Sequence, residues 1–217
     1  MKLPFTIDQF LQVFRDYNLS VFPAQILLVL IALSLVFLSA KRIAGNDRLI
    51  SLTLALFWLW MGIVYQFLFF ATINKAAWLF GSLFIAQGVL FIYYGVIKQS
   101  LSYRFNRNTR GIIGTILIIF ALVIYPFLGY LFGHIYPSSP TFGLPCPTTI
   151  FTFGVLLWSE RKVPLMILIV PFLWSVVGFS AATQLGMLED LALLIAGIMA
   201  TSILLFRNDV TTRTLVI

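Results

Sequence analysis

The sequence predicts an all-α membrane protein, a bundle of about seven transmembrane helices. Of its 217 residues, 61% are hydrophobic and only 10% are charged, and the mean hydropathy is +1.03. Soluble domains carry about 25% charged residues, so a water-soluble fold of this composition could not cover its own surface. The apolar runs are also unbroken over about 20 residues, which is typical of membrane helices and not of the alternating strands of a barrel.

Seven apolar segments form the expected spans, and a helix needs roughly 20 residues to cross the hydrocarbon core. The fifth segment has only 12 residues, so we expect the proline-rich loop before it to re-enter the membrane. Six full spans and one half-span are the alternative. The expected spans are residues 21–40, 49–71, 77–97, 111–133, 148–159, 163–182 and 191–206.

The distribution of basic residues predicts the orientation of the bundle. Three of the 14 Lys and Arg residues (Lys2, Arg15 and Lys75) fall on one side of the expected spans, and the other 11 fall on the opposite side. Because basic loops stay in the cytoplasm, the N-terminus is expected outside and the C-terminus inside. The same bias explains the net charge of +7. We therefore expect contacts with the lipid bilayer and no nucleic-acid partner.

The whole chain, residues 1–217, is expected to form a single transmembrane domain. Its first segment, residues 1–18, predicts an amphipathic helix in the outer interface, with Thr6 as N-cap and apolar residues at helical spacing. A frayed terminus is the alternative. A weak internal repeat, in which Arg48 and Lys162 head the second and sixth spans, predicts a 3+1+3 parallel arrangement.

Several chemistries are excluded by what the sequence lacks. No Asp, Glu, Lys or Arg lies centrally in an expected span, which argues against a carboxylate proton relay and a voltage sensor. The seventh span has no Lys, so a retinal Schiff base is excluded. The chain also lacks a Walker A loop and the H-E-x-x-H, G-x-S-x-G and C-x-x-C motifs. These absences favour a role other than catalysis.

The most polar segment is the outer proline-rich loop, residues 134–147, together with the start of the fifth span. Pro147 suits the first turn of a helix, which makes Cys146 the expected N-cap and places its thiol at the positive end of the helix dipole. This arrangement predicts a pocket for an anion, a soft metal ion or a small polar ligand. The alternative is a rigid cap that only plugs the short fifth span.

Polar side chains gather in the outer half of the expected bundle and form the candidate ligand site. Its members are His134, Tyr136, Cys146, Thr148, Thr149, Gln66, Glu189 and Asp190. Glu189 and Asp190 precede the seventh span, where carboxylates also suit the helix dipole. The deep tryptophans are candidates to line a cavity: Trp58, Trp60 and Trp174.

A metal site is a weaker hypothesis. His134 and Cys146 are the only His and Cys in the chain, and together they suit Cu(I) or a similar soft ion. Two ligands leave such a site incomplete, and the five methionines show no clustered motif. A hydrogen-bonded loop histidine and a small buried thiol are therefore the favoured interpretation.

Three stretches carry a resemblance to a known family. They are Met1–Phe10, Leu59–Tyr65 and, most specifically, residues 136–154 with their Pro-Cys-Pro-Thr-Thr core. They resemble a family of bacterial multi-pass membrane proteins known only as a domain of unknown function. The resemblance implies a location in the bacterial cytoplasmic (inner) membrane and transfers no activity.

Three functional hypotheses follow. The leading hypothesis is a transporter or channel for a small solute or ion, with an outward-facing site at residues 134–149. The second is a membrane-embedded redox, metal-binding or ligand-binding protein that uses Cys146 and His134. The third is a non-catalytic assembly or sensor subunit. A homo-oligomer is compatible with each hypothesis.

Overall fold

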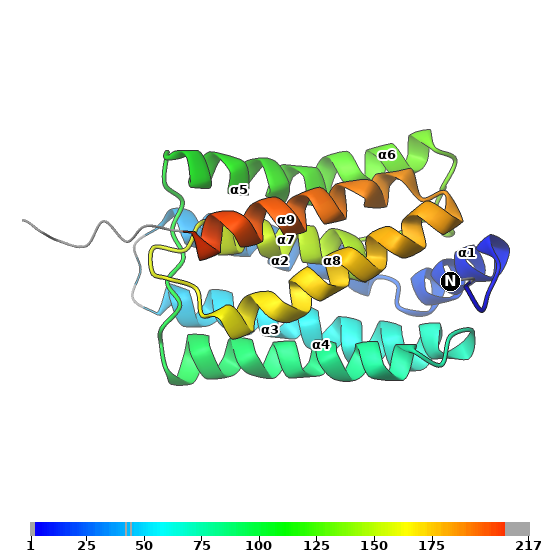
Figure 1. The fold of residues 1–217 in the computed structure, drawn as a ribbon, viewed down its shortest axis with the longest axis horizontal. Coiled ribbons are helices and arrows are strands. Elements are labelled where there is room, and N and C mark those ends of the chain that lie inside the picture. Colours follow the sequence, from blue (N-terminus) through cyan, green and yellow to red (C-terminus); the bar gives the residue numbers. More distant parts are fainter. Residues whose placement is uncertain (1–2, 42, 44, 207–217) are drawn as a thin grey trace, which may run out of the picture.

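The computed structural model describes residues 3–41, 43 and 45–206. Within these residues every regular element is a helix, as the composition predicts (Figure 1). The helices follow one another in the order α1 (Ile7–Ser20), α2 (Ala24–Ala40), α3 (Asn46–Trp60) with η1 (Met61–Phe69) and η2 (Phe70–Thr72), α4 (Ala77–Phe91) with η3 (Ile92–Ile97), α5 (Thr109–Ile119) with η4 (Phe120–Ile124) and α6 (Tyr125–Leu131), α7 (Pro145–Leu157), α8 (Leu165–Leu185), η5 (Leu188–Asp190) and α9 (Leu191–Leu205).

The apolar helices are those of a membrane-embedded bundle. In the described part of the chain, five continuous helices are long and apolar enough to cross a membrane: residues 46–72, 77–97, 109–131, 165–185 and 188–205. A sixth span results if α1 and α2 count as one, although the chain bends by 82° between them. The expected fifth span is α7, an apolar helix of 13 residues. The prediction of about seven spans therefore stays a prediction, as do the orientation and the internal repeat.

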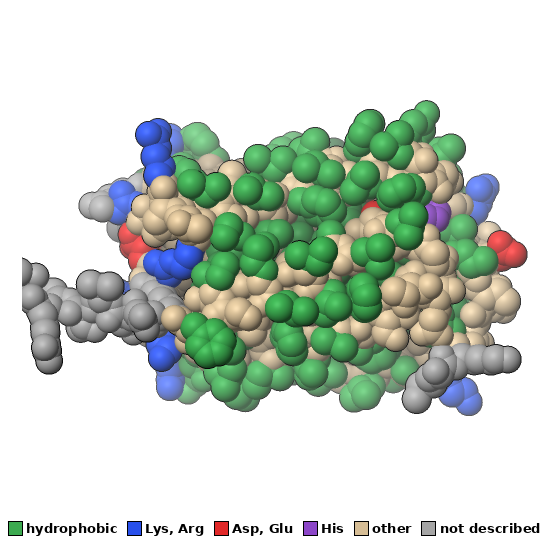
Figure 2. Space-filling model, turned by 45° about the horizontal axis from the view of Figure 1, so that its top comes forward, with side chains coloured by type: hydrophobic (Ala, Val, Ile, Leu, Met, Phe, Trp, Pro, Cys, Tyr) green, Lys and Arg blue, Asp and Glu red, His purple; other side chains and the backbone are tan. Residues whose placement is uncertain are grey.

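Charged side chains lie at the two ends of the bundle, and hydrophobic side chains cover its middle (Figure 2). The connections α2–α3, α4–α5 and α7–α8 lie together at one end (Figure 1). Hydrogen bonds join them: Arg104 N–H donates to the backbone oxygen of Trp158 at 2.8 Å, and Tyr103 N–H donates to the side-chain Oδ1 of Asp47 at 2.8 Å. These three connections thus form one surface of the bundle, which we call the basic end.

Helix α7 lies at the centre of the bundle, against α5, α8 and α9 (Figure 1). All of its residues except Cys146 are buried. A helix that is apolar on every side is stable only when other protein surrounds it or when lipid does. Here the surrounding protein explains how so short a helix is accommodated. The close packing needs glycine, because a Cβ on Gly114 of α5 would lie 2.6 Å from the carbonyl oxygen of Gly154 in α7.

Helix α1 closes the end of the bundle opposite the basic end (Figure 1). It follows Thr6, the predicted N-cap, whose side chain forms a full capping box with Gln9, and it extends from Ile7 to Ser20. Its apolar face is buried against the bundle and includes Val13, Phe14 and Tyr17. The helix is therefore packed onto the bundle as a cover, and its place in the outer interface stays a prediction.

The proline-rich loop enters the bundle and packs beside α1. Phe142, Gly143 and Leu144 are buried, and the ring of Phe142 lies against Phe57 and Phe151 with centroid distances of 5.3 Å. Irregular backbone at this depth needs protein partners for its polar groups.

The fully buried side chain of Asn18 supplies those partners. Its Nδ2 donates to Pro137 O at 2.7 Å and to Ser139 O at 2.8 Å, and its Oδ1 accepts from Thr141 Oγ1 at 2.7 Å. The last turn of α1 is therefore fastened to three points of the loop.

Candidate functional site

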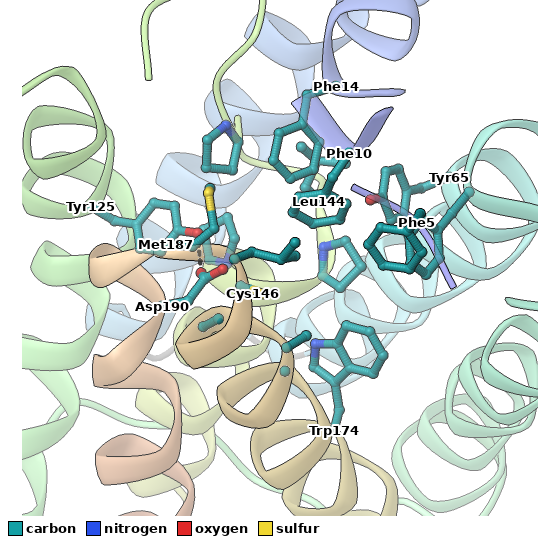
Figure 3. Close-up of a pocket in the computed structure, with 18 residues that line it drawn as sticks. Phe5, Phe10, Phe14, Tyr65, Tyr125, Leu144, Cys146, Trp174, Met187 and Asp190 are labelled. Atoms are coloured by element: carbon teal, nitrogen blue, oxygen red, sulfur yellow. Dashed lines mark hydrogen bonds between the residues drawn. The ribbon is translucent and has the colours of Figure 1, made fainter. Parts of the chain in front are cut away.

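A cavity of about 50 Å³ lies beneath α1, between the start of α7 and residues of η1, η2, α6 and α8 (Figure 3). A volume of this size holds a few water molecules or one small chemical group. Its lining is almost entirely apolar. The lining residues are Phe5, Phe10, Phe14, Tyr65, Phe70, Tyr125, Pro140, Leu144, Pro145, Cys146, Pro147, Trp174, Gly178, Ala181, Ala182, Leu185, Met187 and Asp190.

Aromatic rings form the roof and one wall of this cavity. Phe10 and Phe14 of α1 pack with ring centroids 4.5 Å apart, and Phe5 meets Phe70 at 5.5 Å. Tyr65 comes from the π-helix η1 and stacks on Phe70 at 5.8 Å. A π-helical segment changes which face of a helix a side chain occupies, and such segments are frequent at functional sites. The rings present their faces and edges to the cavity instead of hydrogen-bonding groups.

The carboxylate of Asp190 forms the polar floor. Its Oδ1 accepts a short hydrogen bond from the hydroxyl of Tyr125, and the two groups point toward one another in Figure 3. The thiol of Cys146 also interacts with Asp190. Asp190 is 4% exposed, and among the described residues it forms no ion pair with a Lys, Arg or His.

A buried indole N–H stands beside the same floor. A Cβ on Gly178 would lie 3.7 Å from Cys146 Sγ and 3.7 Å from Trp174 Nε1, so these two atoms face the same spot. Trp174 Nε1 is buried and interacts with the thiol of Cys146. The cavity thus offers one carboxylate, one thiol and the indole N–H beside that thiol.

The neighbouring carboxylate, Glu189, points elsewhere. Its Oε1 lies 2.7 Å from Nδ1 of His134, and its Oε2 is buried without a hydrogen-bond partner among the described residues. Gly129 of α6 lies beside this contact, because a Cβ there would lie at an ordinary van der Waals distance of 3.6 Å from Glu189 Oε1. Neither Glu189 nor His134 lines the cavity.

The turn between α8 and α9 explains why two adjacent carboxylates face different partners. Helix α8 ends at Gly186, whose φ of +72° is a left-handed conformation that suits glycine. The chain then forms the 3-10 helix η5 (Leu188–Asp190). In a 3-10 helix successive side chains point about 120° apart, so Glu189 faces His134 and Asp190 faces the cavity.

The start of α7 differs from the predicted start. Cys146 was expected as N-cap, but α7 begins at Pro145 with Leu144 as N-cap, so Cys146 lies in the first turn. Two prolines, Pro145 and Pro147, fit this turn because its backbone N–H groups have no helical partner to lose. The shift turns the Cys146 side chain toward Asp190 and the cavity.

Comparison with protein families identifies a family to which the chain can be assigned. A family model described as a family of unknown function (DUF6064) matches residues 7–215. The chain belongs to this family. Comparison with curated proteins and with solved structures found no match. The resemblance to an uncharacterised family is therefore confirmed, while the bacterial origin and the inner-membrane location stay predictions.

In this DUF6064 member the structure brings together only some of the predicted site residues. Cys146 and Asp190 meet at the cavity, and His134 and Glu189 form a pair beside it. Of the three deep tryptophans that were candidates to line a cavity, Trp174 lines this one, whereas Trp58 and Trp60 do not.

The other predicted residues lie away from the cavity. Thr148 accepts the backbone N–H of Gly143 at 3.0 Å and so supports the loop. Thr149 and Gln66 are buried with side-chain atoms that have no hydrogen-bond partner in the described chain, and neither lines the cavity. Tyr136 is exposed at the surface.

The proposed metal pair is not assembled as one site. His134 contacts Glu189 and Cys146 contacts Asp190. Among the described residues there is no group of three His, Cys, Asp or Glu side chains that would hold a metal ion. The His134–Cys146 metal site therefore stays a prediction with little geometric support.

Two features of this DUF6064 site were missed by sequence analysis. Asn18, which fastens the loop, stands in a segment that was expected at the interface. Phe10 and Phe14, which form part of the roof, belong to the predicted apolar helix face, but this face was expected to lie in the membrane interface. An asparagine on the apolar side of an amphipathic helix was the available signal, because a buried amide requires partners.

Proposed function

We propose that this protein is a membrane carrier for a small organic cation, and that Asp190 binds the ammonium group of this solute in the cavity beneath α1. One observation carries the proposal. Asp190 is buried at an aromatic cavity and faces no cationic side chain among the described residues. A buried carboxylate with no cationic partner is costly even when it accepts hydrogen bonds, and a positively charged ligand would reduce that cost.

The walls of the cavity fit the same ligand class. The faces of Trp174, Tyr65 and Tyr125 attract cations through the ring quadrupole, and this attraction grows when water is excluded. The indole N–H of Trp174 and the thiol of Cys146 add polarity at the floor only. An anion would meet a carboxylate with no compensating base, so the site disfavours anions.

The size of the cavity limits the ligand. A volume of about 50 Å³ suits a headgroup such as methylammonium, together with a water molecule at most. Larger amines would require α1 to move away. Because α1 is a separate helix joined to α2 through an 82° bend, it is the element best placed to open this end.

Release toward the basic end would require a second arrangement of the bundle, as in alternating access. Helix α7 separates the cavity from that end, and its packing against α5 through Gly114 and Gly154 would have to slide. The proposed carrier must therefore adopt a second conformation, in which the cavity opens toward the basic end.

The second hypothesis, a redox or metal-binding protein, has less support. His134 and Cys146 contact different carboxylates, and no larger ligand group is present in the described residues. The third hypothesis, a non-catalytic subunit, leaves the buried Asp190 and the aromatic cavity without a role.

The test is ligand binding by the purified full-length protein in lipid nanodiscs. Methylammonium should bind and quench tryptophan fluorescence, whereas methanol, a neutral molecule of similar size, should not. Asp190→Asn should weaken methylammonium binding by about tenfold or more, because the charge is lost while the Tyr125 contact is kept. Asp16→Asn, an exposed carboxylate on α1, is the matched control.

Transport is tested separately with labelled methylammonium in proteoliposomes. Saturable uptake that Asp190→Asn abolishes would support the carrier function. Equal binding of methanol and methylammonium, or wild-type binding by a correctly folded Asp190→Asn variant, would overturn the proposal. Binding without uptake would reduce the function to that of a membrane receptor for the same solute.

A further inference from the structure

A second hollow opens on the side of the bundle, between α2 and the η4–α6 segment. This lateral groove has a volume of about 330 Å³ and an apolar lining. Its rim includes the exposed side chains of Phe22, Ile26 and Tyr136. Because these outer helix faces are apolar, the groove opens toward lipid if the bundle is embedded as its helices indicate.

One polar atom in this groove has no partner. Gln25, which lines the groove, is 7% exposed, and its Nε2 donates to the backbone oxygen of Asn18 at 2.6 Å. Its Oε1 is buried and receives no hydrogen bond from any described residue. A buried acceptor without a donor is costly, so this atom is the point at which a ligand would gain most.

The lateral groove and the cavity share a wall. Tyr125 and Pro140 line both hollows. The hydroxyl of Tyr125 belongs to the cavity side, where it donates to Asp190. This side chain therefore stands between the lipid-facing groove and the carboxylate.

The chemistry of the groove selects one kind of occupant. Gln25 Oε1 requires a hydrogen-bond donor, and no charged side chain lines the groove. The rings of Phe22 and Tyr136 at the rim suit a cation. Beyond the position of such a cation, the groove continues as an apolar track for an alkyl chain, lined by Ile26, Val29 and Leu122.

We propose that the lateral groove binds a membrane-dissolved alkylamine, whose ammonium N–H donates to Gln25 Oε1, and passes it past Tyr125 to Asp190. The substrate would then enter from the bilayer and not from water. This inference rests on the proposed function for its choice of an ammonium headgroup. It specifies the substrate class further, because the amine must carry an apolar chain.

The probe is a decylamine analogue with a photoreactive diazirine near the end of its chain, added to full-length protein in phosphatidylcholine nanodiscs. Irradiation should label residues of α2 and η4 near Val29 and Leu122, as mapped by mass spectrometry. Decylamine should compete about fivefold better than decyltrimethylammonium, which has the same charge but no N–H donor. Equal competition, or label spread evenly over the apolar surface, would overturn the inference.

Two variants make the test specific. Gln25→Leu removes the acceptor and should reduce labelling by about fivefold. Val29→Trp fills the track while keeping the Gln25 amide in the chain and should have the same effect, which covers the case in which Gln25→Leu fails to fold. Thr201→Val is the matched control, since Thr201 also carries an unpartnered buried hydroxyl but lies in another groove, between α8 and α9.

The groove and the cavity can be judged independently. If decylamine labels the groove while methylammonium fails to bind at Asp190, the lateral site stands and the proposed function fails. If methylammonium binds while Gln25→Leu and Val29→Trp leave decylamine labelling unchanged, the lateral site fails and the proposed function stands.

Discussion

The carboxylate of Glu189 meets Nδ1 of His134 at 2.7 Å, with the glutamate side chain completely buried and the histidine 13% exposed. This pair joins the turn before α9 to the loop after α6. Removing one partner of a buried pair leaves the other without compensation, which costs more than the pair itself contributes.

We therefore expect His134→Ala to lower the free energy of unfolding by about 3–5 kcal/mol. Chemical unfolding in detergent, followed by circular dichroism, measures the change. The double variant His134→Ala/Glu189→Gln should recover part of the loss, because no buried charge remains. Tyr136→Phe is the control, and a loss below ~1 kcal/mol for His134→Ala would contradict the expectation.

The hydrogen bonds of Asn18 lead to a second prediction, which concerns amide exchange in the proline-rich loop. Asn18→Ala removes the three side-chain hydrogen bonds to Pro137, Ser139 and Thr141, each worth about 1 kcal/mol. Residues 135–144 should then exchange amide hydrogens faster, as measured by mass spectrometry. Gln12→Ala also removes a side-chain hydrogen bond of α1, the exposed one to Asp16, and should leave the loop unchanged. Unaltered exchange in Asn18→Ala would mean that packing alone holds the loop.

The covering role of α1 predicts the reactivity of Cys146. Because this is the only cysteine in the chain, maleimide labelling reports on it alone. Phe14→Ala removes a roof side chain and should speed labelling by about tenfold, which corresponds to ~1.4 kcal/mol of easier opening. Phe37→Ala, an exposed phenylalanine on α2, is the matched control. Equal labelling rates in the two variants would show that α1 does not control access.

Cysteine labelling measures the orientation of the bundle in the membrane. In a Cys146→Ala background, a membrane-impermeant maleimide added to intact cells should label Ser139→Cys in the loop beside α1. It should not label Asn106→Cys, which lies at the basic end. The charge bias predicts this pattern. The reverse pattern would place the N-terminus in the cytoplasm.

The sequence predicted the features that depend on composition and local chemistry. Apolar runs predicted helices, and the Thr6 capping box marks the start of α1 in the structure. The start of α7 was placed two residues late, because Pro145 and Pro147 both suit a first turn and only the packing of Leu144 decides between them.

The features that depend on contacts between distant residues were not predictable. Asn18 and Thr141 stand more than a hundred residues apart, and no periodicity relates them. The turn η5 sends Glu189 and Asp190 to different partners, whereas sequence analysis treated them as one acidic pair. The candidate residues lie in one region of the structure, but their division between the cavity and the separate His134–Glu189 contact required the fold.

The enclosure of α7 has a consequence for how the protein is made. A helix of 13 residues is about 20 Å long, well short of a bilayer core. It therefore cannot settle in lipid when it leaves the ribosome. Helices α8 and α9, which pack against it, are synthesised afterwards. We therefore expect α7 to reach its final position only after α8 and α9 have been synthesised and have packed against it.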